Sequence, residues 1–490
     1  MHRLILAILC ASFLPSAIAQ TGVLISTAPP TSESLRIVQT LQLPSAVQGN
    51  FDHFGIDLKR NRLFATPEAF KAVLVFDLST GKMVHQIDGI ARPHAVFYRP
   101  DLDQIYVSDG GDGSLKIYDG ETYRLIDHIA LLKDADSIGY DISRKYLYID
   151  NGGGDVGQPY SMLSVVDTTE HKKIADVKID GDTLEAMALD NYRPRIYVND
   201  KAKNQVVVVN RLTNTVVATW PLTMGKVNVA MALDEQRQRL FVGCRSGQIV
   251  VLDTNTGKEL QALPISKGVD DLIFDPATRR LYAAGDGAVD VLDQTDLDHY
   301  VVRGSVPSGA KGKTARLVPE LNRLFVAVPG EAGKNARIII FEPVNTQPAK
   351  SVVVEPKAQV DSPISEKIVL DTLSTHPFLR KLGLHVIPPD QQNMVLVANG
   401  NATRIGIRTS EGDFAAVKDG KTYCAKIDDG AFYNIKMQMF DAQGHRIGIL
   451  VMEIPYTSAV DVADAIHKAE SIREEVEHRI PSLEALFHHA

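Results

Sequence analysis

A short strand pattern, in which an aromatic residue stands between two aliphatic ones, recurs seven times along the chain. The copies are Leu63-Phe64-Ala65, Ile105-Tyr106-Val107, Leu147-Tyr148-Ile149, Ile196-Tyr197-Val198, Leu240-Phe241-Val242, Leu281-Tyr282-Ala283 and Leu324-Phe325-Val326. Their aromatic residues lie 42, 42, 49, 44, 41 and 43 positions apart. A period of this length is typical of propeller blades, so the pattern predicts an all-β, seven-bladed β-propeller over residues 35–343.

Each copy carries the same order of strands and turns. An apolar strand such as Val229–Leu233 precedes an Asp-containing turn, and the aromatic strand follows. A β-branched strand that ends in an acidic residue comes next, as in Ile249–Asp253, and the turn Thr254–Gly257 leads to one more strand. Each copy therefore predicts four strands, with the aromatic residue packed in the core between blades.

The last copy ends after its third strand, at Ile338–Phe341, so its fourth strand must come from elsewhere. Leu35–Leu43 resembles the fourth strands of other copies, such as Lys173–Ile179. We predict that this N-terminal strand completes the last blade and closes the ring. Ser351–Glu355 is the rival for the same place.

The repeats resemble those of a known family. One copy reads Arg195-Ile-Tyr-Val-Asn199, then Val206–Asn210, then Thr213-Asn-Thr215. This order looks like the repeats of the YVTN family of surface and periplasmic β-propellers. The likeness covers about residues 35–345. It implies the propeller fold and little about activity, because that family includes binding proteins, lactonase-like enzymes and quinoprotein relatives. Quinoprotein relatives tend to be rich in Trp, whereas this chain has one, Trp220.

The repeat stops near Pro343, and residues 344–363 are interpreted as a linker. Residues 364–482 are predicted to form a smaller α+β domain, and residues 483–490 a tail. A helix is expected over 364–373 and another over about 459–479, the latter with an apolar stripe of Val462, Ile466, Ala469, Ile472, Val476 and Ile480. Strands are expected at 394–398, 404–408, 414–418, 433–439 and 447–454, the last two forming a hairpin.

This order of elements resembles PAS-like or Cache-like sensor domains. The resemblance implies a small metabolite bound between sheet and helix. Arg404, Arg408, Tyr433 and Lys436 are the candidates for contacting an anionic ligand. The alternative is that each is an ordinary surface or packing residue.

Composition and charge narrow the functional classes. The formal net charge is -8 and there is no run of Lys or Arg, so nucleic acid is not an expected partner.

The N-terminus carries the features of a targeting segment: Arg3, the apolar run Leu4–Leu14 and Ala17-Ile18-Ala19. They predict a cleaved signal peptide over residues 1–19, with a retained anchor as the alternative. The apolar run is too short to span a bilayer, so we expect no membrane span after cleavage and a periplasmic or secreted bacterial protein. Cys10 gives a weak lipoprotein signal. Cys244 and Cys424 are expected to be free and mostly buried, the alternative being a disulfide between the two domains.

Polar residues mark the start of each innermost strand, where blades converge on the channel. They are Asp52-His53, His94, Asp136, Glu185, Asn228, Asp270-Asp271 and Lys313. Polar groups of a wet channel need no special role. The sharper hypothesis is a divalent cation, the candidate cofactor, held by His53, His94, Asp136, Glu185 and Asp270, with water as a nucleophile.

No catalytic motif accompanies these residues, and Gly304-Ser-Val lacks the frame of a nucleophile elbow. The sequence therefore favours an exported, non-catalytic protein that binds a small molecule or another protein. A metal-assisted, lactonase-like hydrolase with its site at the channel mouth is the alternative.

Overall fold

The computed structural model of the chain describes residues 34–190, 193–331, 333–344, 357–417, 420–427 and 432–488. The predicted signal peptide and the rival strand Ser351–Glu355 lie outside these residues. Within them the strands form seven four-stranded antiparallel sheets and one five-stranded sheet, a mostly β, propeller-like fold. Short 3-10 helices interrupt the connections: η1 (Glu68–Phe70), η2 (Gly153–Val156), η3 (Pro319–Leu321), η4 (Ala402–Arg404), η5 (Tyr456–Ser458) and η6 (Glu484–Phe487).

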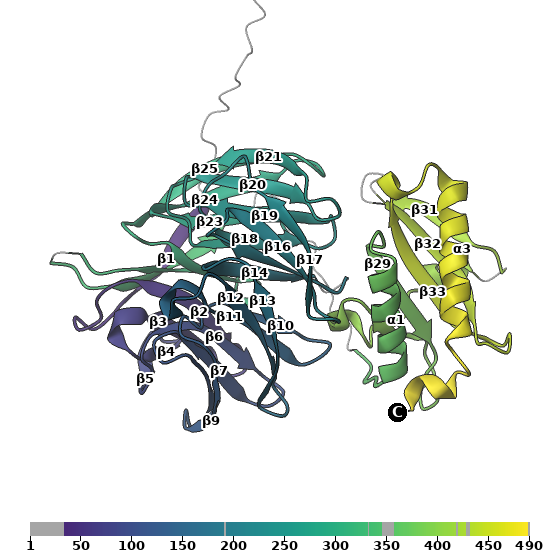
Figure 1. The fold of residues 1–490 in the computed structure, drawn as a ribbon, viewed down its shortest axis with the longest axis horizontal. Helices are drawn as coiled ribbons and strands as arrows, with labels where there is room; N and C mark the ends of the chain where they lie inside the picture. Colours follow the sequence, from purple (N-terminus) through teal and green to yellow (C-terminus); the bar gives the residue numbers. More distant parts are fainter. Residues whose placement is uncertain are drawn as a thin grey trace, which may run out of the picture. The chain divides into compact units, whose positions relative to one another are not determined.

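The seven four-stranded sheets follow one another along the chain (Figure 1). In hydrogen-bonded order they are β2 (Phe51–Asp57), β3 (Arg62–Pro67), β4 (Val73–Asp77) and β5 (Met83–Ile87); β6 (Pro93–Arg99), β7 (Gln104–Asp109), β8 (Ser114–Asp119) and β9 (Leu125–Ala130); β10 (Ile138–Asp141), β11 (Tyr146–Gly152), β12 (Ser161–Asp167) and β13 (Lys172–Ile179); β14 (Leu184–Asp190), β15 (Arg195–Asp200), β16 (Gln205–Asn210) and β17 (Thr215–Pro221); β18 (Asn228–Asp234), β19 (Arg239–Cys244), β20 (Gln248–Asp253) and β21 (Glu259–Pro264); β22 (Asp271–Asp275), β23 (Arg280–Gly285), β24 (Gly287–Gln294) and β25 (Tyr300–Gly309); and β26 (Thr314–Val318), β27 (Arg323–Val328), β28 (Arg337–Pro343) and β1 (Leu35–Gln42).

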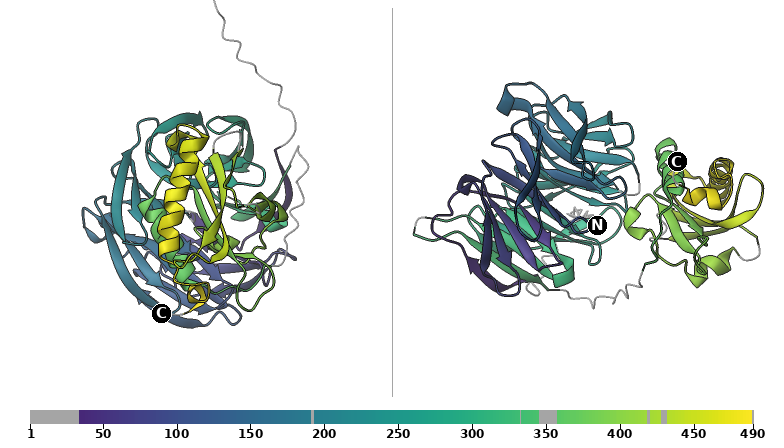
Figure 2. Two further views of the ribbon diagram at one scale, coloured as in Figure 1. Left: turned by 90° about the vertical axis from the view of Figure 1, so that its right-hand side faces the viewer. Right: turned by 90° about the horizontal axis from the view of Figure 1, so that it is seen from below.

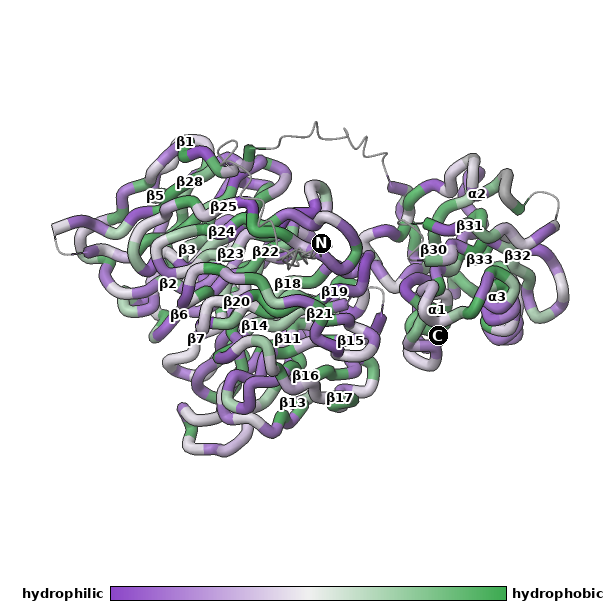
Figure 3. Tube along the Cα trace, turned by 90° about the horizontal axis from the view of Figure 1, so that it is seen from above, coloured by the Kyte–Doolittle hydropathy of each residue, from purple (hydrophilic) through white to green (hydrophobic). Residues whose placement is uncertain are grey.

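The first strands of successive sheets contact one another, and β26 contacts β2, so the series returns to its start. The seven repeated aromatic residues lie on the second strands and are at most 2% exposed. They pack in apolar clusters that join neighbouring sheets; Tyr282, for example, lies with residues of β27 and β28. Figure 3 shows the same arrangement as green, hydrophobic stretches within the strands and purple, hydrophilic stretches in many of their connections. The predicted core role of the aromatic residues is therefore confirmed.

The N-terminal strand completes the last four-stranded sheet. β1 pairs antiparallel with β28, from Leu35 opposite Pro343 to Gln42 opposite Arg337. Leu35 and Leu41 are 1% and 4% exposed, so the strand also contributes to the core. This confirms the predicted pairing of the N-terminal segment.

In several of these sheets an acidic residue at the end of the third strand shapes the turn that follows. The Asp253 carboxylate accepts hydrogen bonds from the backbone N–H groups of Asn255 and Thr256, and Asp77 does the same for Ser79 and Thr80. Such Asx turns explain why the sequence repeats an acidic residue there. Every fourth strand pairs with a register shift, and β-bulges at a sheet edge hinder pairing with another chain.

The remaining strands form the five-stranded sheet, in the order β30 (Val395–Asn399), β29 (Lys381–Val386), β33 (Arg446–Pro455), β32 (Phe432–Phe440) and β31 (Tyr423–Ile427). The helices of this part are α1 (Pro363–Thr375), α2 (Glu411–Ala416) and α3 (Val462–His478). The predicted terminal helices, the strand at 394–398 and the hairpin of β32 and β33 are confirmed.

Two predicted strands of this part are wrong, and two strands were missed. Residues 404–408 begin in η4, where the Asn401 side chain accepts a hydrogen bond from the Thr403 N–H. Residues 414–416 of the second predicted strand lie in α2, where the Ser410 hydroxyl accepts from the Asp413 N–H, and Lys418 lies outside the described residues. These side chains satisfy the first N–H groups of each helix, a local signal that outweighs the apolar pattern. The missed strands are β29 and β31.

Helices α1 and α3 pack on one face of the five-stranded sheet, as Figure 2 shows. The buried stripe of α3 consists of Ala465, Ala469, Ile472 and Val476, whereas Val462 is 42% exposed. Ala469, Ile472, Val476 and Ile480 of the predicted stripe are therefore confirmed in the core, whereas its N-terminal end at Val462 was extended one turn too far. Leu486 in η6 is fully buried in the same core, so the ordered structure extends into the predicted tail.

Two further findings bear on the predictions from composition. Cys244 and Cys424 are both free, as predicted; Cys244 is buried and Cys424 is half-buried. Among the described residues, no helix has both the length and the apolar character needed to cross a membrane.

Candidate functional site

A polar cavity of about 290 Å³ opens among the first strands of the seven four-stranded sheets. Each of these sheets contributes to its wall. The lining residues are Asp52, His53, Glu68, Arg92, His94, Asp134, Asp136, Asp155, Thr183, Leu184, Glu185, Ala186, Lys201, Val229, Arg245, Asp270 and Lys313. Charged side chains of both signs therefore dominate the wall.

The structure brings together most of the polar residues predicted at the channel. Each stands at or just before the beginning of a first strand, and these beginnings meet at one end of the sheets. Asn228 and Asp271 are the exceptions, because neither lines the cavity. Asn228 is fully buried and donates to the Asn199 side chain and the Gln205 carbonyl, at 2.8 and 2.9 Å. Asp271 accepts from the Ala315 N–H at 2.7 Å.

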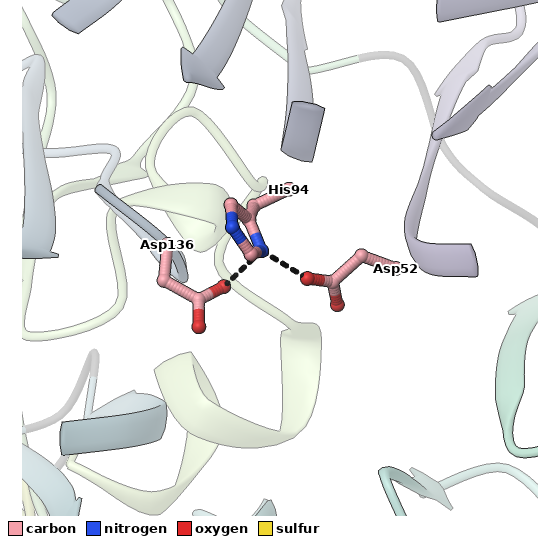
Figure 4. A group of neighbouring side chains, drawn as sticks. All are labelled: Asp52, His94 and Asp136. Carbon is pink, nitrogen blue, oxygen red and sulfur yellow. Dashed lines mark hydrogen bonds and ion pairs between the residues drawn. The ribbon is translucent and has the colours of Figure 1, made fainter. Parts of the chain in front are cut away.

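His94 lies between two carboxylates from neighbouring sheets (Figure 4). Its Nδ1 pairs with Oδ2 of Asp52 and lies 3.4 Å from Oδ1 of Asp136. On its other side, the Arg92 Nε–H donates to His94 Nε2 at 2.7 Å. One ligand atom from each of Asp52, His94 and Asp136 lies within 4.8 Å of the other two, a spacing that a metal ion could bridge.

The two carboxylates beside His94 differ in their protonation behaviour. Burial raises the pKa of Asp136 to about 7, and the nearby charges of Asp52 and Glu185 act in the same direction. Burial also opposes ionisation of Asp52, but His53 and His94 outweigh it and lower its pKa to about 2. One carboxylate is thus held ionised, and the other lacks comparable compensation.

The other predicted ligands line the same cavity but have partners of their own. His53 Nδ1 lies 2.9 Å from Asp271, and its Nε2 lies 3.5 Å from Asp52. Glu185 pairs with Lys201, and Asp270 pairs with Arg245 and Lys313. These pairs already neutralise Glu185 and Asp270.

The sequence interpretation missed several wall residues: Glu68, Arg92, Asp134, Asp155, Lys201 and Arg245. Lys201 and Arg245 directly follow the second strands β15 and β19. Because the end of a second strand pairs with the beginning of the first, as Leu184 does with Asp200, residues just after the aromatic strand lie at the same mouth. Strand register was therefore the signal that could have located Lys201 and Arg245.

In the five-stranded sheet, the four predicted anion contacts have different surroundings. Tyr433 is 2% exposed and belongs to the core on the helix side of the sheet. Lys436 forms an ion pair with Asp413. Arg404 ends η4, and Arg408 forms an isolated β-bridge with Val395.

Charged residues gather on the face of this sheet opposite α1 and α3. Lys381 and His385 alternate with the core residues of β29, and Lys381 Nζ lies 3.4 Å from Oε1 of Glu453 on β33. Burial lowers the pKa of His385 to about 3, and the positive charges of Lys381, Arg404 and Lys436 add to this effect. Its Nδ1 lies 2.9 Å from the Thr409 hydroxyl.

Comparison with known proteins identifies the fold. No protein-family model and no curated protein sequence matches the chain. Among solved structures, a chain of the "Crystal Structure of Mitotic Checkpoint Complex" matches with a TM-score of 0.54 and 14% identity, covering 68% of this chain and 99% of that chain. A chain of hydrazine synthase from Kuenenia stuttgartiensis matches with a TM-score of 0.50 and 15% identity, covering 60% and 96%. At such low identity these matches establish a propeller-like fold and no activity.

Proposed function

We propose that the chain is an exported, non-catalytic binding protein in which seven blades close into a propeller and hold a ligand at the channel mouth. The observation that carries this proposal is the cavity to which all seven four-stranded sheets contribute. Binding sites are concave and have a few convergent polar groups, and propeller-like chains are compatible with binding roles.

The character of the wall indicates the class of ligand. Only Leu184, Ala186 and Val229 contribute apolar side chains, whereas Lys201, Arg245 and Lys313 present cations that are partly exposed. An apolar ligand would displace water from these charged groups and offer them no polar contact in return. A small charged metabolite, able to exchange with the existing ion pairs, fits best.

The test is a thermal-shift and calorimetric panel of amino acids, hydroxy acids and sugar acids on the full chain. We expect Lys313→Met and Arg245→Met to weaken binding of any hit by at least tenfold, because each removes a charge from the wall. Lys203→Met is the matched control, since Lys203 pairs with Asp180 and does not line the cavity. A hit that tolerates both wall substitutions would place the ligand elsewhere.

We also propose that the part formed by α1, α3 and the five-stranded sheet binds a small anion, in line with its resemblance to PAS-like or Cache-like domains. Lys381, Arg404 and Lys436 outnumber Glu453 and Asp413 around His385, so the charge there favours an anion. Citrate, phosphate and short dicarboxylates are the probes. Lys436→Met should weaken binding, whereas Lys468→Met, which breaks a pair with Asp464 on α3, should not.

A metal-assisted hydrolase with a lactonase-like activity is the second candidate. It is favoured by the approach of Asp52, His94 and Asp136, whose ligand atoms could hold a cation beside the cavity. An open position on such a cation would activate water. A panel of lactones and esters, assayed with and without chelator, separates the candidates: chelator-sensitive turnover would replace the binding proposal.

The proposal includes export from the cytoplasm, in line with the resemblance to the YVTN family of surface and periplasmic proteins. Expression of the full sequence in a bacterium, followed by fractionation, should recover the protein outside the cytoplasm with an N-terminus at Gln20. A full-length protein in the cytoplasmic fraction would contradict export and leave the ligand proposals standing.

A further inference from the structure

We infer that Asp52, His94 and Asp136 form a binding site for a divalent transition-metal ion on the wall of the cavity. The inference places the ion on the wall of the cavity invoked in the proposed function, but it does not require an organic ligand to bind there. The three residues come from three consecutive sheets: Asp52 from β2, His94 from β6 and Asp136 from the segment just before β10. Their ligand atoms, one from each residue, lie within 4.8 Å of one another (Figure 4).

The spacing of these atoms suits a metal ion. Metal–ligand bonds of about 2.1 Å place neighbouring ligand atoms roughly 3 Å apart. Oδ1 of Asp136 lies 3.4 Å from Nδ1 of His94, close to that value. An ion between them requires Asp52 and His94, now in direct contact, to separate slightly.

The backbone holds Asp136 in place. Its N–H donates to the Asp150 carbonyl at 3.0 Å, and its carbonyl accepts from the Ser108 hydroxyl at 2.6 Å. β2 and β6, which carry the other two residues, contact each other. A site built on such strands is already shaped for its ion, so little ordering is needed on binding.

Unsatisfied carboxylate oxygens point to a missing positive charge. Oδ1 of Asp136 is buried and accepts no hydrogen bond, and the same is true of Oδ1 of Asp150. Asp150, which is 2% exposed, lies on β11, next to the Asp136 segment. Buried carboxylate oxygens that accept no hydrogen bond are costly, and a bound cation would compensate them. Glu185 and Asp270, in contrast, already have lysine or arginine partners.

The ligand types select the kind of ion. One imidazole and two carboxylates suit Zn²⁺ or Mn²⁺, whereas Ca²⁺ and Mg²⁺ prefer oxygen ligands alone. Three protein ligands leave at least one position for water or a ligand in the cavity.

Arg92 is the group that opposes the ion. Its Nε–H donates to His94 Nε2, and its positive charge faces the site, while a second nitrogen pairs with Asp134 at 2.5 Å. Binding through Nδ1 of His94 requires the guanidinium to leave Nε2. We therefore expect Arg92→Met to bind the ion more tightly than the parent chain.

The experiment titrates the full chain, stripped of metal by a chelator, with Zn²⁺, Mn²⁺, Ca²⁺ and Mg²⁺ alone. We expect one Zn²⁺ or Mn²⁺ ion to bind per chain. Binding should also raise the melting temperature, which is measured by the fluorescence of Trp220. His94→Gln and Asp136→Asn should each weaken binding at least tenfold. Co²⁺ absorption adds a second readout, because loss of the imidazole ligand changes its visible bands.

His299→Gln is the matched control, because His299 pairs with Asp296 on the surface, outside the cavity, and its loss should change nothing. If Asp136→Asn fails to fold, Asp52→Asn replaces it. Equal effects of all four ions, unchanged affinity in the cavity variants, or weaker binding by Arg92→Met would each overturn the inference. If the metal does not bind but an organic ligand still does, the inference fails and the proposed function stands.

Discussion

Two buried histidines, one beside the cavity of the four-stranded sheets and one on the five-stranded sheet, have pKa values shifted in opposite directions. His94 and His385 are 5% and 8% exposed, and burial by itself lowers the pKa of both. Around His94 the carboxylates of Asp136 and Asp52 outweigh burial and raise the pKa to about 10. Around His385 burial prevails and three cations reinforce it, so the pKa falls to about 3. Burial lowers the pKa in both places, and only the carboxylates beside His94 are strong enough to reverse that direction.

The same contrast extends to the wider surroundings. The cavity of the four-stranded sheets has an abundance of carboxylates, several of them paired with partly exposed cations. The face of the five-stranded sheet has an abundance of cations around Glu453, which is 5% exposed. A cavity open to water tolerates the loss of a charge, whereas a closed face does not. Four predictions test this difference.

The largest effect is expected for Glu453→Gln. Arg380 and Lys381, whose side chains are 6% and 12% exposed, would lose the charge that compensates them. Removing one partner of a buried pair should cost about 3 kcal/mol of the free energy of unfolding. Hydrogen exchange in β29 and β33 reports the loss.

The matched substitution in the cavity is Asp270→Asn. It leaves Arg245 and Lys313, which are 34% and 23% exposed and can be hydrated. We expect a cost of no more than about 1 kcal/mol, read from Trp220 fluorescence during denaturation. Equal costs for the two substitutions would remove the proposed difference between the sheets.

The effect of pH is expected to lie between those of the two substitutions. Because the folded-state pKa of His385 lies below the unfolded value of 6.5, its contribution to stability is present above that value and is lost as the pH falls toward 3. Between pH 7 and pH 5 the five-stranded part should lose about 2 kcal/mol. His385→Gln should flatten this dependence, and His445→Gln, at an exposed histidine, should not.

The smallest effects are expected for exposed pairs in both regions. Lys173→Met breaks a pair with Asp176 on β13, and Lys367→Met breaks a pair with Asp371 on α1. Each should change the free energy of unfolding by less than about 0.5 kcal/mol. A large change in the free energy of unfolding for only one of the two substitutions would show that the location of the pair, and not its burial, determines how much its loss destabilises the protein.

The accuracy of the sequence predictions also differs between the two regions. In the repeats, Phe64, Tyr106 and their counterparts recur at nearly constant spacing, so each copy checks the others and the strands were predicted well. The other part has no repeat. There the segment around Phe414 was taken for a strand, because the capping role of Ser410 is visible only when its neighbours are placed.

The sequence by itself determined the seven four-strand units, the strand that completes the last one, and the polar residues at the strand beginnings. It could do so because periodicity and turn chemistry are local properties of the chain. Only the tertiary structure decided which of those residues have partners. Asp52 joined His94 and Asp136, while Glu185 and Asp270 were neutralised by Lys201, Arg245 and Lys313. Such pairing depends on distances between groups far apart along the chain, and so do the opposite pKa shifts of His94 and His385.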